Sequence, residues 1–444
     1  MLISKIKTTI NLAVPIVIGQ MGVMLMGLAD TIQVGQMPEL AAESLGAAGT
    51  AGSIFFTIAV VGLISIGIAS PLVSKAIAEK DPGEAGLILK SNIKVALFLS
   101  SITFFIIFIL GYNYDIFGQT EINKKLTLPY LALIDFSVFF TFLFGAFKSF
   151  TDGLKNTKVG MVITLSALIL NILLNQIFIY GWGPIPAMGL TGSGISTLFC
   201  RMAMAGSIGL YIKFRKDYDK YFIKKEYKAK FEREIYLIKT GVPSGFQGFF
   251  EIAAFGSAVI MMGWISVTAQ AAHMVAVNMA AITFMAATGI AAAGGINVGS
   301  GMGNKSRAEI LISGNAAILI VSTLMIFTSF VMFFGRDLLV RGYTNEIAVI
   351  DIAVKLIIWG AIFQLFDGVQ AVSLGLLRGM QDVNIPTIIT VIAYWGIGIP
   401  SSYYLGIKTD FGATGIWMGL CISLIVSSIL LTWRFYYQAK RVKL

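Results

Sequence analysis

Long apolar stretches follow one another along almost the whole chain and are separated by short polar connections. A helix that crosses a membrane needs about 20 mostly apolar residues, and these stretches reach that length. The pattern therefore predicts an all-α membrane protein with twelve transmembrane helices. The predicted spans are 9–35, 46–73, 88–110, 127–150, 159–181, 189–212, 237–262, 267–298, 308–334, 347–377, 385–406 and 412–436.

Lysine and arginine are distributed unevenly between the polar connections. If the N-terminus is cytoplasmic, inside segments hold 25 of these residues and outside segments hold 5. The densest segment is 213–233, with nine. A basic run of this kind can be a solvated charge run or a nucleic-acid patch, but long apolar flanks favour a cytoplasmic membrane linker. We expect a multi-pass protein of the bacterial cytoplasmic (inner) membrane with both termini cytoplasmic, and no nucleic-acid partner.

The overall composition agrees with this class of protein. Hydrophobic residues make up 57% of the chain and charged residues 13%, whereas charged residues are about a quarter of a typical soluble domain. The two cysteines, Cys200 and Cys421, lie inside apolar segments and indicate no disulfide framework. A single histidine excludes most zinc chemistry. No organic cofactor is expected.

The two halves of the chain repeat each other. Six spans per half leave both halves in the same orientation, so we expect them to be related by an axis along the membrane normal, with a cavity between two lobes near the midplane. The predicted units are an N-terminal six-helix lobe, 1–212, the basic linker 213–233, and a C-terminal six-helix lobe, 234–444. The matching pairs are Pro15 and Pro243, Gly67 and Gly289, Gly153 and Gly379, and Gly189 and Gly412.

Two carboxylates within the predicted spans of the second half lie at the same depth. Glu251 follows Lys239 by twelve residues, and Asp367 precedes Arg378 by eleven. At about 1.5 Å per residue, both lie roughly 17–18 Å from the inner surface. Such a pair could share one proton or jointly bind a cation, and either behaviour suits ion coupling. The alternative is a pair of hydrogen-bonded structural carboxylates.

Other polar residues within the spans are candidates for a binding cavity. Asp30, near the outer end of the first span, and Asp135 are costly in lipid and are therefore functional candidates. Asn171 and Asn175 lie one turn apart, where amides either line a cavity or hold helices together. His273 is a further cavity candidate, although a hydrogen-bonded core histidine is the simpler interpretation.

Six segments together resemble the multidrug and toxic compound extrusion (MATE) transporters, most of all the bacterial NorM-type branch. The similarity extends over all twelve predicted spans. No single motif is decisive, but their order and spacing are specific. The segments are LADTIQVG at 28–35, SFTDGLKNTK at 149–158, LNILLNQIFIYG at 170–181, VPSGFQGFFE at 242–251, AAHMVAVN at 271–278 and FDGVQAVSLGLLRG at 366–379.

The resemblance implies a cation-coupled antiporter that exports lipophilic, often cationic compounds by alternating access. The family's membrane carboxylates map onto Asp30, Glu251 and Asp367, with sodium or protons as the coupling ion. Sodium-coupled relatives often have a tyrosine one turn before the tenth-helix aspartate, where this chain has Phe363. Sodium is coordinated by about six oxygen ligands, by analogy with other hard cations, and Phe363 supplies none. Sodium at Glu251 and Asp367 stays the first expectation, with protons second.

Three alternative functions agree less well with the sequence. A flippase for a lipid-linked substrate would favour several cavity cations, but only Arg201 and Lys355 lie well within the spans. An intramembrane aspartyl hydrolase would need Asp30 and Asp367 together, and their depths differ. No nucleotide-binding P-loop is present. We therefore expect a secondary active transporter rather than an enzyme, a monomer with small organic substrates and membrane lipid as its partners.

Overall fold

The computed structural model describes residues 1–222 and 231–442 of the 444-residue chain. Residues 223–230 of the basic linker and the last two residues lie outside this part. Across the described residues the fold is all-α, and the expected twelve membrane-length helical spans are present. An isolated bridge pairs Trp182 with Ile185 in the turn after the fifth span. The predicted fold class is confirmed.

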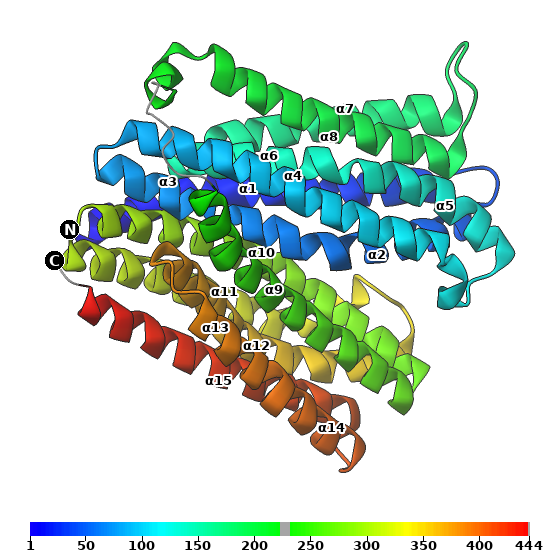
Figure 1. The fold of residues 1–444 in the computed structure, drawn as a ribbon. Helices are drawn as coiled ribbons and strands as arrows, with labels where there is room; N and C mark the ends of the chain where they lie inside the picture. Colours follow the sequence, from blue (N-terminus) through cyan, green and yellow to red (C-terminus); the bar gives the residue numbers. More distant parts are fainter. Residues whose placement is uncertain (223–230, 443–444) are drawn as a thin grey trace. The chain divides into compact units, whose positions relative to one another are not determined.

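The first six spans contain several broken helices (Figure 1). The second span consists of α2 and α3, and the fourth of α5 and α6. Short 3₁₀ segments, η1 and η2, follow α4 and α8. The elements are α1 (Leu2–Gly35), α2 (Ala41–Gly67), α3 (Ala69–Ala78), α4 (Pro82–Tyr112), η1 (Tyr114–Phe117), α5 (Glu121–Phe136), α6 (Val138–Gly153), α7 (Lys158–Tyr180), α8 (Gly189–Phe214) and η2 (Lys216–Tyr221).

The last six spans are mostly single long helices. The exception is the eleventh, in which a π-helical segment, η3, connects α13 to α14. The elements are α9 (Glu232–Ile265), α10 (Val267–Gly303), α11 (Arg307–Arg341), α12 (Ile347–Gly379), α13 (Asn384–Val391), η3 (Ile392–Gly398), α14 (Ile399–Ile407) and α15 (Gly412–Arg441).

Prolines account for two of these irregularities. Pro71 has no N–H to donate to the carbonyl of Gly67, which is the last residue of α2. Pro400, in the first turn of α14, directly follows the π-helical segment. Missing backbone donors are commonly accommodated by such local breaks and wide turns. The apolar pattern predicted both spans but not these breaks.

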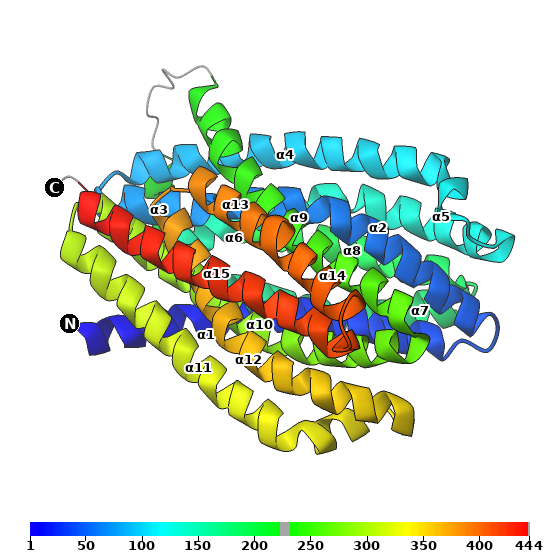
Figure 2. The same cartoon turned by 90° about the horizontal axis from the view of Figure 1, so that it is seen from below.

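The chain forms two compact units that do not coincide with its two halves. The N-terminal unit is Ile18–Gly245, and the C-terminal unit combines Met1–Val17 with Phe246–Leu444. The first turns of α1 therefore pack with helices of the second half, and the first turns of α9 pack with helices of the first half. Figures 1 and 2 show both chain ends at the same end of the C-terminal unit. The predicted lobes, 1–212 and 234–444, follow the sequence repeat and do not include this exchange.

Polar contacts hold the start of α1 within the C-terminal unit. Lys5 Nζ lies 2.5 Å from Glu309 Oε1 of α11. The buried amide of Asn297 on α10 donates to Thr9 Oγ1 at 3.0 Å. Because one contact is an ion pair and the other is fully buried, they specify the position of α1 along both neighbouring helices.

The start of α9 is held in a similar way within the N-terminal unit. Arg233 donates two hydrogen bonds to the carboxylate of Glu84 on α4, at 2.7 and 2.6 Å, and Glu234 accepts from Lys94 at 2.9 Å. Gly245 lies so close to α2 that an added Cβ would stand 2.2 Å from the carbonyl oxygen of Val61. Small residues permit this close approach of two helix backbones.

In the C-terminal unit, α10 and α12 pack closely against each other. A Cβ added at Gly375 would lie 2.3 Å from the carbonyl oxygen of Ala291, and one added at Gly379 would lie 2.6 Å from that of Gly295. Glycine is therefore required at these positions for steric reasons. The close approach fixes how α12, which carries Asp367, lies against α10.

We expect Gly375→Ala to destabilise the protein, because its methyl group would meet a backbone atom that cannot move without shifting α10. Overpacking of this kind costs about 1–3 kcal/mol. The midpoint of thermal unfolding in detergent should fall below that of the wild type. Gly256→Ala on α9 is the matched control, because a Cβ there would have no neighbour within 4 Å. Equal midpoints for the two variants would contradict the packing argument.

Candidate functional site

The C-terminal unit brings Glu251 of α9 close to Asp367 of α12. Asp367 is only 4% exposed and Glu251 is partly buried, and the two carboxylates are near enough for their charges to interact. Gln370 Nε2 donates to Glu251 Oε1 at 3.4 Å, and the Tyr394 hydroxyl donates to the same oxygen at 3.3 Å. The two acids, for which the sequence predicted equal depth, therefore also lie close to each other in the structure.

Helical spacing explains how this polar cluster is built. Gln370 lies about one turn after Asp367 on α12, so both side chains lie on the same side of that helix. The wide turn of η3 carries Tyr394, whose hydroxyl also lies 3.1 Å from Gln370 Nε2. π-Helical turns occur frequently at functional sites. Sequence reasoning missed Gln370 and Tyr394, because it considered only charged groups and amides in pairs.

A second polar layer lies one turn earlier on α9. Gln247 donates to Thr390 Oγ1 at 3.1 Å and accepts from Arg378 Nη2 at 3.3 Å. Gln247 and Thr390 precede Glu251 and Tyr394 by four residues each, so the two layers stack along the same helices. The count of lysine and arginine in the connections placed Arg378 in an inside segment. In the structure it lies in the last turn of α12, near enough for its charge to interact with Glu251.

The composition of the cluster suits a hard monovalent cation. Glu251 and Asp367 provide carboxylate oxygens and Tyr394 provides a hydroxyl, whereas Gln370 directs its amide nitrogen at Glu251 and Tyr394. Oxygen ligands of this kind bind hard cations. Phe363 adds no oxygen, since it is 3% exposed and packs edge-on against Phe255 and Trp417. Across residues 1–222 and 231–442, three His, Cys, Asp or Glu side chains nowhere come together as a metal site.

The N-terminal unit brings Asp30 together with both asparagines of α7. Asn171 Nδ2 donates to Asp30 Oδ1 at 3.1 Å and Asn175 Nδ2 donates to the same oxygen at 2.6 Å. Thr197 of α8 donates to Asp30 Oδ2 at 3.4 Å. Every one of these bonds is donated to the acid, so the arrangement is compatible with an ionised carboxylate. Asp30 is partly buried, whereas both asparagines are fully buried.

In the described part of the structure, the N-terminal cluster has unpaired amide oxygens and lies near an arginine that is already engaged elsewhere. The amide oxygens of Asn171 and Asn175 are buried and have no hydrogen-bond partner within the described chain. Arg201, one turn from Thr197, places its guanidinium over the Phe55 ring, 4.6 Å from the centroid, and donates to Ser137 Oγ at 2.6 Å. Buried polar atoms without partners are costly, so the cluster is suited to a polar ligand or water.

The other two candidates lie apart from these hydrogen-bond networks. His273 is fully buried, and its Nδ1 accepts a hydrogen bond from Trp417 Nε1 at 3.1 Å. This is the environment of a neutral core histidine, although Nε2 has no partner in the described chain. Asp135 is 3% exposed near the break between α5 and α6, and one of its oxygens also has no such partner.

A known protein family matches the chain twice, once in each half of the repeat. The MatE family model matches residues 15–177 and 243–404, two segments that begin at Pro15 and Pro243, the first pair of the repeat. A probable multidrug resistance protein NorM from Acinetobacter baylyi is 29% identical over 97% of this chain and 96% of its own length. The multidrug resistance protein NorM of Vibrio vulnificus is 30% identical, with coverages of 97% and 95%.

Solved structures show the same fold. A eukaryotic MATE transporter, AtDTX14, superposes with a TM-score of 0.87 at 17% identity, covering 99% of this chain and 98% of its own. An outward-facing multidrug resistance MATE family transporter gives a TM-score of 0.88 at 19% identity, with coverages of 99% and 97%. Twelve apolar helices in this fold define a multi-pass membrane protein of the MATE transporter class. The chain belongs to the MatE family, within which it resembles the NorM proteins.

We expect Asn175→Leu to destabilise the N-terminal unit, because it removes the shortest hydrogen bond to Asp30. A lost hydrogen bond to a charged group costs about 2 kcal/mol. Adding Asp30→Leu should recover part of this loss, since the double variant buries no unpaired carboxylate. Thermal unfolding of the wild type, both single variants and the double variant gives the coupling energy.

The Asn175–Asp30 coupling should exceed the roughly 0.5 kcal/mol within which independent sites add. Strictly additive losses would contradict a direct bond between the two side chains.

Proposed function

We propose that this protein is a cation-coupled multidrug efflux antiporter, which exports lipophilic, often cationic compounds by alternating access. The observation that carries the proposal is the buried pair Glu251 and Asp367 with Gln370 and Tyr394 around it. Family membership and the similarity to the multidrug resistance proteins NorM support the transport of drugs. Secondary active transport is not enzyme chemistry, and the protein acts without a cofactor apart from its coupling ion.

Sodium is the first choice for the coupling ion and protons are the second. Two close carboxylates repel each other when both are ionised, and either a bound cation or a proton removes this repulsion. The hydroxyl of Tyr394 adds an oxygen ligand where Phe363 has none, which supports sodium. Ion binding at Glu251 and Asp367 would then favour one arrangement of the transporter over the other.

Coupling between ion and substrate is reciprocal. If the ion weakens substrate binding when the cavity faces outward, substrate must weaken ion binding by the same factor. Asp30 is the proposed contact for a cationic substrate, since it is partly buried and accepts hydrogen bonds from Asn171 and Asn175. The unpartnered amide oxygens of these asparagines would also accept a bond from a protonated amine.

The proposed setting is the bacterial inner membrane, with both termini cytoplasmic and the protein acting as a monomer on small organic compounds. The distribution of lysine and arginine supports this orientation. A flippase for a lipid-linked pyrophosphate is disfavoured, because Arg201 is engaged with Phe55 and Ser137. That function would instead require several cations free to bind phosphate.

The proposal is tested by efflux of a fluorescent organic cation from proteoliposomes, first under a sodium gradient at symmetric pH and then under a proton gradient alone. Wild-type protein should respond to sodium. Asp367→Asn should lower ion-driven efflux to the level of empty liposomes while leaving insertion and thermal stability intact. Asp351→Asn is the matched control, because it changes an exposed carboxylate of the same helix.

Each outcome discriminates between the coupling schemes. Efflux driven only by protons would replace sodium binding by protonation of the same pair. Normal ion-driven efflux by the Asp367→Asn variant would refute the site. Absence of efflux under both gradients would favour a lipid-linked substrate.

A further inference from the structure

A groove between α7 and α8 lies apart from both polar clusters. It encloses about 390 Å³ in the N-terminal unit, at the ends of these helices next to the basic linker. Its floor is apolar, and its mouth carries polar and basic groups. The groove is lined by residues that include Val159 and Val162 of α7, Ser207 and Tyr211 of α8, and Asn156 and Lys158 at the mouth.

The apolar part of the groove is open to the surroundings of the helices. Val162 is 55% exposed, and Ser207 is also exposed. On a membrane-spanning helix such positions contact lipid chains or a partner. Because Ser207 has a short side chain, it leaves space that a longer apolar residue would occupy.

The mouth of the groove holds a fixed polar network and two exposed cations. Asn156 Nδ2 donates to the hydroxyls of Tyr211 and Tyr218, both at 3.1 Å. Arg215 Nη1 donates to the Tyr211 hydroxyl at 2.6 Å. Lys158 is exposed at the start of α7. Arg215 also contacts Asp217, but both partners are exposed, and such surface pairs contribute little energy.

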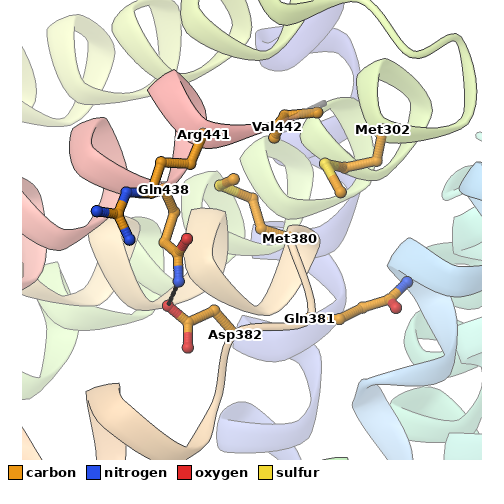
Figure 3. A pocket seen from close by; sticks show the side chains of 7 residues that line it. All are labelled: Met302, Met380, Gln381, Asp382, Gln438, Arg441 and Val442. Atoms are coloured by element: carbon orange, nitrogen blue, oxygen red, sulfur yellow. Dashed lines mark hydrogen bonds between the residues drawn. The ribbon is translucent and has the colours of Figure 1, made fainter. Parts of the chain in front are cut away.

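In the second half of the repeat, the position that corresponds to the mouth of this groove carries an internal carboxylate. The Gly153–Gly379 match aligns Asn156 with Asp382, and the Gly189–Gly412 match aligns Tyr211 with Arg434. There, Arg434 Nε donates to Asp382 Oδ2 at 2.7 Å, and Gln438 Nε2 donates to it at 3.1 Å. Figure 3 shows the Gln438–Asp382 contact beside its own small cavity. The second half thus neutralises its cation with an internal carboxylate.

The first half has no carboxylate at the aligned position, and the anion beside Arg215 is the exposed Asp217. Asn156 is neutral where Asp382 is charged, and Lys158 aligns with the neutral Asn384. Ser207 aligns with Leu430, which is 38% exposed and supplies apolar bulk on α15. At aligned positions 156 and 158 the groove is therefore more positive than its repeat partner, and at Ser207 it is less filled.

We propose that the groove binds one anionic glycerophospholipid of the adjacent leaflet. Its phosphate lies between Lys158 and Arg215, and an acyl chain follows Val159 and Val162 past Ser207. Basic pockets between transmembrane helices on the cytoplasmic side are suited to anionic head groups. A free phosphate would use the cations but not the apolar floor, which is why the lipid is the occupant to which we commit.

The test uses purified full-length protein in detergent and measures the rise in unfolding midpoint on titration with phosphatidylglycerol or phosphatidylcholine of identical chains. Wild-type protein should respond to phosphatidylglycerol at a concentration at least about tenfold lower than the concentration of phosphatidylcholine that it needs. Each cation near an anionic lipid contributes about fivefold in affinity. Lys158→Ala with Arg215→Ala should therefore make the two lipids equivalent. High salt should reduce the preference of the wild type.

Ser207→Leu, taken from the repeat partner, should weaken binding of both lipids by filling the groove. Lys7→Ala, which removes an exposed lysine of α1, is the charge control and should bind like the wild type. The proposal is overturned by equal responses of the wild type to both lipids, or by an undiminished preference in the double alanine variant. Competition by soluble glycerophosphoglycerol alone would instead identify a free-anion site, and loss of a dimer in Ser207→Leu would identify a contact between two copies. No transport gradient enters these measurements, so they stand apart from the proposed antiport.

Discussion

An ionised side chain placed at the centre of a bilayer costs about 3 kcal/mol or more, and both polar clusters are arranged to meet that cost. Asp30 accepts three hydrogen bonds from neighbouring helices. Glu251 and Asp367 share a cluster with an amide and a hydroxyl. Because the donors come from α7, α8, α12 and η3, compensation of these acids also determines which helices are neighbours. The hydrogen bonds that stabilise the acids and the packing of helices within each unit therefore depend on each other.

Hydropathy predicted the twelve spans because lipid imposes length and composition on each helix separately. The same reasoning could not find the break before Ala69 or the wide turn at Tyr394, since these depend on single prolines and on neighbouring helices. Helix ends also extend beyond the apolar stretches. α9 begins at Glu232, where Arg233 and Glu234 are paired with side chains of α4. A hydropathy window treats such paired charges as loop.

The candidate residues were predictable to different degrees. The depth of Glu251 and Asp367 follows from counting residues, since helical rise is constant. The hydrogen bonds of Asp30 with Asn171 and Asn175 depend on which faces of α1 and α7 are turned toward each other. No local pattern in a single sequence specifies those faces. Gln370 and Tyr394 were missed because neutral polar residues are common in spans and gain meaning only from a partner.

The exchange of helix ends between the compact units has a consequence for synthesis of the chain. The unit Ile18–Gly245 contains the first turns of α9, so it cannot be completed until the ribosome has passed the linker and begun the seventh helix. Met1–Val17 precedes α10 and α11 in the chain, so the contacts of Thr9 and Lys5 with those helices can form only after both have been synthesised. Although the halves repeat, neither is a self-sufficient product of translation. The gene duplication that the repeat records therefore yielded two halves that now complete each other.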